Sequence, residues 1–206
     1  MFGIFSIKSH FDKTKQAWLT AILIIFIGFV FGAFYSNAVT DKNFADYKTF
    51  LDEWTKNAPL SFDSPMTSVF SVSDITTLLL VFLWSFFLFG KPASGFFSFK
   101  SGFSLGFFVS FLIKVFGMKG FAAGMYILFN YLVFTVPCLA AVTAQSFVLN
   151  SCITSAVFGK SGSGRERDIK RLFFPFVIVL GIAAAVTLLG NYIGRFVTIK
   201  ILKALF

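Results

Sequence analysis

The sequence predicts an all-α fold, a polytopic helical membrane bundle of about five transmembrane helices with a cytoplasmic N-terminus. Three stretches carry no charged residue, namely 16–40, 120–159 and 172–194. Each is long enough to cross a hydrocarbon core of roughly 30 Å, for which a helix needs about 20 residues. The composition agrees, since 57% of the 206 residues are hydrophobic and 13% are charged, against about 25% charged in soluble domains. We therefore expect a single membrane domain over residues 1–206.

The first span is predicted at 17–39, after a short basic N-terminal segment. A secretory signal peptide is the alternative, because Ser36, Asn37 and Ala38 resemble a cleavage site. The apolar run, however, exceeds the 7–15 residues or so of a signal-peptide core. Residues 40–74 follow as the only sizeable polar segment, and we expect this acidic segment to lie outside the cell.

Four apolar residues inside that segment recur at three- and four-residue steps: Phe44, Tyr47, Leu51 and Trp54. This spacing predicts one face of an amphipathic helix that ends before Pro59. Such a face is typical of a helix lying on the bilayer surface with its rings at headgroup level. The alternative is that these four residues dock on a partner protein, so they are candidate contact residues.

The remaining spans are predicted at 71–90, 101–117, 120–145 and 172–194. The connection 90–106 contains Pro92 and four glycines; it is interpreted as a tight loop, with a bent or partly re-entrant segment as the alternative. Residues 120–158 are too long for one straight crossing. Either a bend near Pro137 tilts the helix, or its last third continues into the headgroup layer. Pro175 suits the first turn of the last span.

The distribution of cations predicts the orientation. The loop 159–171 carries five cations against two acids, so the positive-inside rule places it in the cytoplasm. Counted over five spans, the rule also favours a cytoplasmic N-terminus. The cations lie at the ends of apolar segments, where they anchor helices to lipid headgroups. Membrane lipids are therefore expected partners, and nucleic acid is not.

Small residues are spaced for close helix packing in four G-x-x-x-G pairs. Such pairs let two backbones approach and gain van der Waals contact. We expect packing within the bundle, with a homo-oligomer contact, driven above all by the last pair, as the alternative. The pairs are Gly28 and Gly32, Gly102 and Gly106, Gly120 and Gly124, and Gly190 and Gly194.

Two amides, Asn130 and Asn191, are predicted at membrane depth. A side-chain amide in hydrocarbon must find a hydrogen-bond partner, so we expect both to bond between helices. A coupled carrier would usually show an acid within a span. Asp74 is placed at the edge of the second span, which argues against proton- or sodium-coupled transport.

No catalytic, metal or cofactor site is predicted. His10 has no second histidine or cysteine near it in the sequence, which is not a zinc pattern. Cys138 and Cys152 lie 14 residues apart, or about 21 Å on one continuous helix, too far for a disulfide. We therefore expect a non-enzymatic protein without a cofactor.

The layout and several segments resemble the stage II sporulation protein M family. The resemblance is carried by GFVFG (28–32), FGKPASGFFSFKSGFSLGFFVSFL (89–112) and VPCLAAVTAQSF (136–147). KSGFSLG is the most specific piece, because the family tends to place a polar residue and a G-x-x-x-G pair there. One departure is Phe129-Asn130, where many members carry proline and a polar residue.

The resemblance implies a multi-pass scaffold in a bacterial cell membrane. The family's sporulation member gathers two cell-wall hydrolases, an amidase and a lytic transglycosylase, for peptidoglycan remodelling during engulfment. By that resemblance, segment 40–74 would meet those partners. The alternative function is a permease-like or lipid-handling membrane protein, possibly a subunit of a transporter, which would need a polar-lined cavity near Asn130.

Overall fold

The computed structural model describes the backbone of residues 2–38, 65–158 and 165–205, and the side chains of 14–38, 73–158 and 172–194. Within these ranges every residue is helical except those of one turn, Ser85–Phe89. The elements are α1 (Phe2–Ala38), α3 (Pro65–Trp84), α4 (Gly90–Asn130), the π-helix η1 (Tyr131–Thr135), α5 (Val136–Phe158) and α6 (Arg165–Leu205). The prediction of an all-helical fold is confirmed for the described residues.

Three helical stretches are long and apolar enough to cross a membrane: Thr14–Ala38, Gly90–Phe158 and Leu172–Gly194. Ser73–Trp84 is a shorter apolar helix. Their outer surfaces are apolar. Leu19 and Phe26 on α1, for example, are 60% and 61% exposed, as expected of side chains in contact with lipid tails. The chain therefore has the character of a membrane protein, as its composition predicts.

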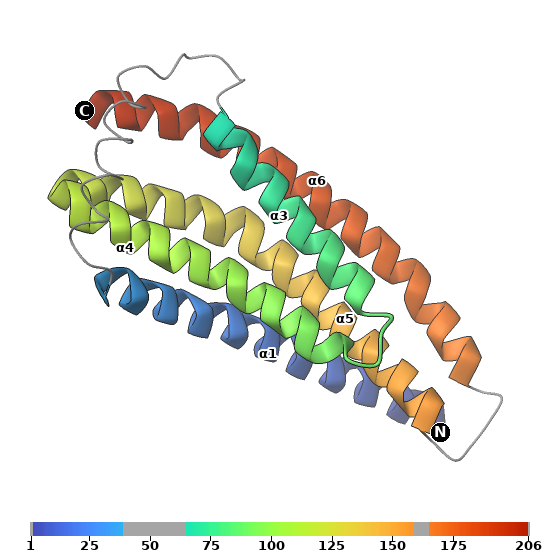
Figure 1. Ribbon diagram of the computed structural model, residues 1–206. Helices are drawn as coiled ribbons and strands as arrows, with labels where there is room; N and C mark the ends of the chain where they lie inside the picture. Colours follow the sequence, from blue (N-terminus) through green and yellow to red (C-terminus); the bar gives the residue numbers. More distant parts are fainter. Residues whose placement is uncertain (1, 39–64, 159–164, 206) are drawn as a thin grey trace.

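The longest of these stretches folds back on itself at Gly117, where the backbone has φ 57° and ψ −129°. This conformation is open to glycine and strained for other residues. The two arms on either side of the reversal lie side by side (Figure 1). A side chain at Gly120 would collide with the Leu112 carbonyl, and one at Gly124 would lie 3.2 Å from Val109. This glycine pair therefore joins the two arms of the hairpin.

The helices run along one common axis (Figure 1). The N-terminal end of α1, the turn between α3 and α4, and the first residues of α6 lie at one end of the bundle. The reversal at Gly117, the C-terminus, and the start of α3 lie at the other end. The chain thus passes along the bundle repeatedly, and residues far apart in the sequence become neighbours.

The connection 90–106 is neither a tight loop nor a re-entrant segment, which corrects both interpretations. α4 begins at Gly90 and runs through this whole range, while α3 ends at Trp84 rather than at residue 90. Pro92 is tolerated because it lies in the first turn of α4, where a backbone N–H has no partner within the helix. Gly90 is required there, since a Cβ would strike the Trp84 carbonyl. The helix that contains the span expected from residue 101 therefore starts eleven residues earlier.

The irregularity expected near Pro137 takes the form of the π-helix η1. The Val136 N–H donates to the Tyr131 carbonyl, one residue further back than in an α-helix. Pro137 has no N–H to donate and its ring crowds the preceding turn, so a widened turn before it relieves the clash. π-bulges of this kind are frequent at functional sites.

α6 begins at Arg165, so Pro175 lies inside the helix and not in its first turn. Two other predicted features fall outside the described residues. The aromatic face of Phe44, Tyr47, Leu51 and Trp54 belongs to 39–64, and the start of the basic loop belongs to 159–164.

Close backbone packing joins α1 to the first arm of α4. A Cβ at Gly28 or Gly32 would strike the carbonyls of Phe99 and Phe103 on α4. The contact is reciprocal. Side chains at the two α4 glycines of this contact would strike carbonyls of α1: Gly102 that of Ile25 and Gly106 that of Phe29. Two G-x-x-x-G pairs thus bring the two backbones into direct contact, the geometry that such pairs allow.

Candidate functional site

A group of polar side chains from four passes of the chain meets midway along the bundle. We call it the polar cluster, and each of its members is half-buried. It comprises Asp74 of α3, Ser101 and Asn130 of α4, Tyr131 of η1 and Asn191 of α6.

Asp74 and Asn191 form the first link of the polar cluster. The Asn191 amide donates to the Asp74 carboxylate over 3.3 Å, although the two residues lie 117 positions apart. Asp74 had been expected at the edge of its span. α3 begins at Pro65, so Asp74 lies ten residues before the helix ends at Trp84, and it is the second residue of the apolar stretch Ser73–Trp84.

Asp74 is also the only carboxylate among the residues whose side chains the structure describes. A charged carboxylate away from water is costly unless it is paired and hydrogen-bonded. The Asn191 amide supplies a neutral donor rather than a cation. A lone acid in such a setting is a common mark of an ion or substrate pathway.

Asn130 forms the second link, between α4 and α6. Its amide donates to the Gly190 carbonyl over 3.3 Å. A Cβ at Gly194 would occupy the place of that amide, and one at Gly190 would collide with Phe134. This glycine pair therefore makes room for Asn130 and Phe134 of the same chain, and that face of α6 is occupied within the bundle.

Tyr131 and Ser101 form the third link, between the two arms of the α4 hairpin. Their hydroxyl groups are hydrogen-bonded to each other. Tyr131 is the first residue of η1, so the widened turn begins at the polar cluster. Asn130 and Tyr131, adjacent in sequence, thereby bond to different neighbours, α6 and the first arm of α4.

A second set of polar contacts joins α4 to α5 nearer the α3–α4 turn. The hydroxyl of Ser94 bonds to that of Ser146 over 2.6 Å, and Ser98 bonds to Thr143 over 2.7 Å. The amide of Asn150 donates to the carbonyls of Ser85 and Phe87 in the turn. All of these residues except Phe87 have fully buried side chains. This set therefore holds α4, α5 and the α3–α4 turn together.

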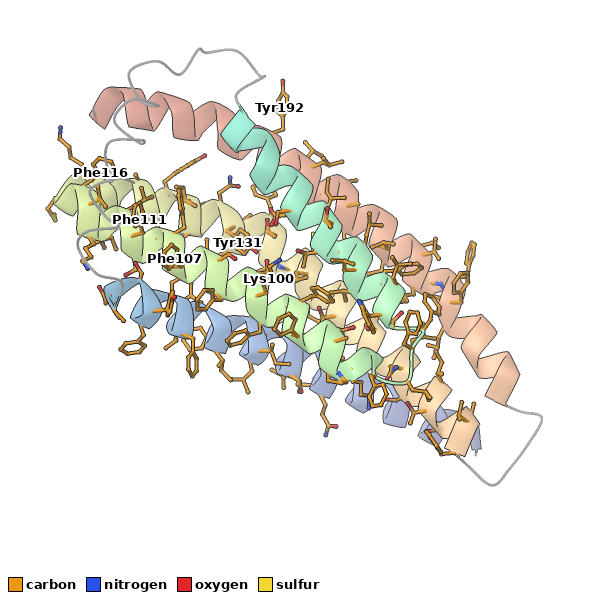
Figure 2. The ribbon with its side chains drawn as sticks, viewed as in Figure 1. Lys100, Phe107, Phe111, Phe116, Tyr131 and Tyr192 are labelled. Carbon is orange, nitrogen blue, oxygen red and sulfur yellow. The ribbon has the colours of Figure 1, made fainter. Side chains whose placement is uncertain are left out.

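Lys100 lies beside the polar cluster in the sequence but on another face of α4. Figure 2 places Lys100 and Tyr131 at the same level, midway along the bundle. The Lys100 side chain is exposed, as are Phe96 and Ser104 one turn to either side. The sequence had suggested that Lys100 opens a span, whereas it lies in the interior of α4.

Sequence reasoning identified Asn130 and Asn191 but missed Asp74, Ser101 and Tyr131 as their neighbours. A signal was present for Asp74, because apolar residues flank it from Val72 to Leu78 with only small hydroxyl residues between. Among the described residues, no three of the types His, Cys, Asp and Glu lie close enough to hold a metal ion. The groups of the polar cluster are hydrogen-bond donors and acceptors around one carboxylate.

Comparison with known proteins gives no assignment: no protein-family model, no curated protein and no solved structure matches this chain.

Proposed function

We propose that the protein is a non-enzymatic scaffold of the bacterial cell membrane, of the stage II sporulation protein M type. In this proposal it crosses the membrane five times, through α1, α3, the first arm of α4, the second arm with η1 and α5, and α6. The N-terminus is cytoplasmic. The direction in which the helices alternate along the bundle supports five crossings.

The observation that carries the scaffold proposal is how the helix contacts are made. Backbones touch at the α1–α4 glycine contact, and serine and threonine hydroxyls pair between α4 and α5. In these contacts, polar groups bond one helix to another, which is typical of a tightly packed bundle. A rigid bundle of this kind suits a scaffold. The apolar outer faces then remain available to lipid and to the membrane anchors of partners.

The proposed partners are a membrane-anchored amidase and a lytic transglycosylase that remodel peptidoglycan. Segment 40–74 is the proposed meeting point, on the outer side. The test is co-purification of both hydrolases with the wild-type chain and with a variant that combines Tyr47→Ala and Trp54→Ala. We expect the variant to lose them. Equal recovery from both chains would remove this segment as the docking site.

A matched control is Leu23→Ala, which removes an apolar side chain that is 56% exposed on α1. This change should leave co-purification unaltered, because α1 faces lipid at that point. If the wild-type chain brings down neither hydrolase from cells that make both, the scaffold proposal itself fails.

A second candidate, a permease-like function, is favoured by one observation: a half-buried carboxylate midway along the bundle, bonded only to a neutral amide. The test is proton or sodium flux into vesicles that contain the purified protein, compared with Asp74→Asn. Flux that the variant abolishes would establish this function. Equal, background flux for the two chains would leave the polar cluster as a packing element.

A further inference from the structure

In the proposed five-crossing arrangement, Lys100 is a cation within the span formed by the first arm of α4. Along α4 it lies nine residues from Lys91 and fourteen from Lys114, or about 14 Å and 21 Å. Those two lysines bound the apolar part of this arm. The aliphatic stem of a lysine is far shorter than either distance, so Lys100 does not reach a headgroup layer by snorkelling.

Lys100 forms no ion pair with any residue whose side chain the structure describes. The only described carboxylate, Asp74, accepts a hydrogen bond from Asn191 at the α3–α6 contact. An ammonium group at this depth is costly, and such residues in membrane proteins pair with an opposite charge or line water. The exposed position of Lys100 therefore calls for an anion other than the one described carboxylate, Asp74.

The geometry of α4 shows which face is available. Gly102 and Gly106 lie on the side of the helix that packs against α1. Ser94 and Ser98 lie on the side that bonds to α5. Phe96, Lys100 and Ser104 lie at four-residue steps on the remaining side and are exposed, Phe96 by 62%. This stripe, the Lys100 face, extends over about 12 Å, enough for two turns of a neighbouring helix.

We propose that the Lys100 face binds a transmembrane helix of a partner protein, and that this helix carries an acidic side chain opposite Lys100. The proposal rests on the proposed scaffold function, because it names how the bundle holds an anchor. Charge complementarity selects the occupant. Lipid phosphates lie at the two ends of the arm, near Lys91 and Lys114, and only an acid carried on a helix reaches this depth.

The test uses the full chain with a donor fluorophore at its C-terminus, in vesicles of neutral phosphatidylcholine. The probe is a synthetic transmembrane peptide of leucine and alanine with one central aspartate and an acceptor dye. A peptide with central asparagine is its control. We expect energy transfer to half-saturate at a peptide-to-lipid ratio about tenfold lower for the aspartate peptide, the size of one interhelical polar contact.

Lys100→Met should remove the difference between the two peptides, and Lys91→Met, at the end of the same helix, should keep it. Lys100→Glu with a lysine-centred peptide should restore binding, which separates a lost charge from a misfolded chain. Equal transfer to both peptides by the wild-type chain, or a difference that survives Lys100→Met, would overturn the proposal. Energy transfer can also be measured between copies of the chain that carry different dyes. If such transfer occurs and Lys100→Met abolishes it, the proposal is overturned, and the Lys100 face instead binds a second copy of this chain.

This outcome is separable from that of the scaffold proposal. If the hydrolases do not co-purify but the aspartate peptide binds through Lys100, the scaffold function fails and the contact stands. If both hydrolases co-purify equally well with Lys100→Met and the peptide shows no preference, the scaffold function stands and this contact fails.

Discussion

Individual glycines set how closely the helices of this bundle approach. A Cβ at Gly106 would lie 2.0 Å from the Phe29 carbonyl oxygen of α1, so any side chain there must push the two helices apart. We expect Gly106→Leu to destabilise the protein by about 1–3 kcal/mol, the usual cost of overpacking. Unfolding in detergent, followed by circular dichroism, measures it.

The matched control for that change is Gly181→Leu on α6. A Cβ at Gly181 would have no atom within 4 Å, so this variant should unfold like the wild-type chain. Destabilisation of equal size by both changes would show that loss of glycine itself, and not the α1–α4 contact, is responsible.

The pair of Asp74 and Asn191 gives a second residue-scale prediction. Asn191→Leu leaves the carboxylate without its donor, whereas Asp74→Asn replaces the charge with a neutral amide that still bonds to Asn191. We expect the first change to cost about 1–2 kcal/mol and the second clearly less, since breaking a polar contact in a membrane costs more when a charge is left behind. Denaturant titration in micelles compares the two; a larger loss for Asp74→Asn would contradict this ranking.

Within residues 65–158 the helices are joined by very short connections, and the reversal in α4 is the shortest. Gly117 has a positive φ with a ψ that side chains disfavour. Gly117→Ala should therefore destabilise the hairpin by about 1–3 kcal/mol through backbone strain alone, because nothing lies within 4 Å of its Cβ position.

Thermal unfolding of Gly117→Ala beside Gly181→Ala isolates this effect. Both changes add one methyl group in open space, but only the first does so at positive φ. Coincident unfolding curves for the two variants would mean that the reversal tolerates a side chain.

The sequence predicts that the helices exist, but it does not predict where each helix begins and ends. Long charge-free runs locate α1, the second arm of α4 with α5, and the apolar part of α6, because transfer energetics act on each segment alone. Lys100 and Pro92 misplaced the start of α4. In sequence, a charge indicates a helix end and a proline a break, whereas Lys100 lies exposed in the interior of α4 and Pro92 lies in its first turn.

The polar cluster was less predictable for a physical reason. Its links join residues 117, 60 and 30 positions apart, and none follows from local periodicity. Asn130 and Asn191 were found because an amide in an apolar run is conspicuous. Their partners depend on how the helices pack. The π-helix η1, which begins at Tyr131, has no signal in the sequence beyond the nearby Pro137.

For the molecule as a whole, the sharpest expectation concerns the sides of the membrane. The proposed five crossings would place Ser163 on the same side as the N-terminus and Ala204 on the opposite side. In a chain lacking Cys138 and Cys152, we expect Ala204→Cys to react with a membrane-impermeant maleimide in intact cells, and Ser163→Cys to react only after permeabilisation. Labelling of Ser163→Cys in intact cells would reverse the orientation.

The reversal at Gly117 also bears on how the chain is made. A single residue of non-helical backbone separates the two arms in the folded protein. The depth of one arm in the bilayer therefore sets the depth of the other. A nascent chain that stops within the second arm would leave the first without the neighbour that fixes its depth.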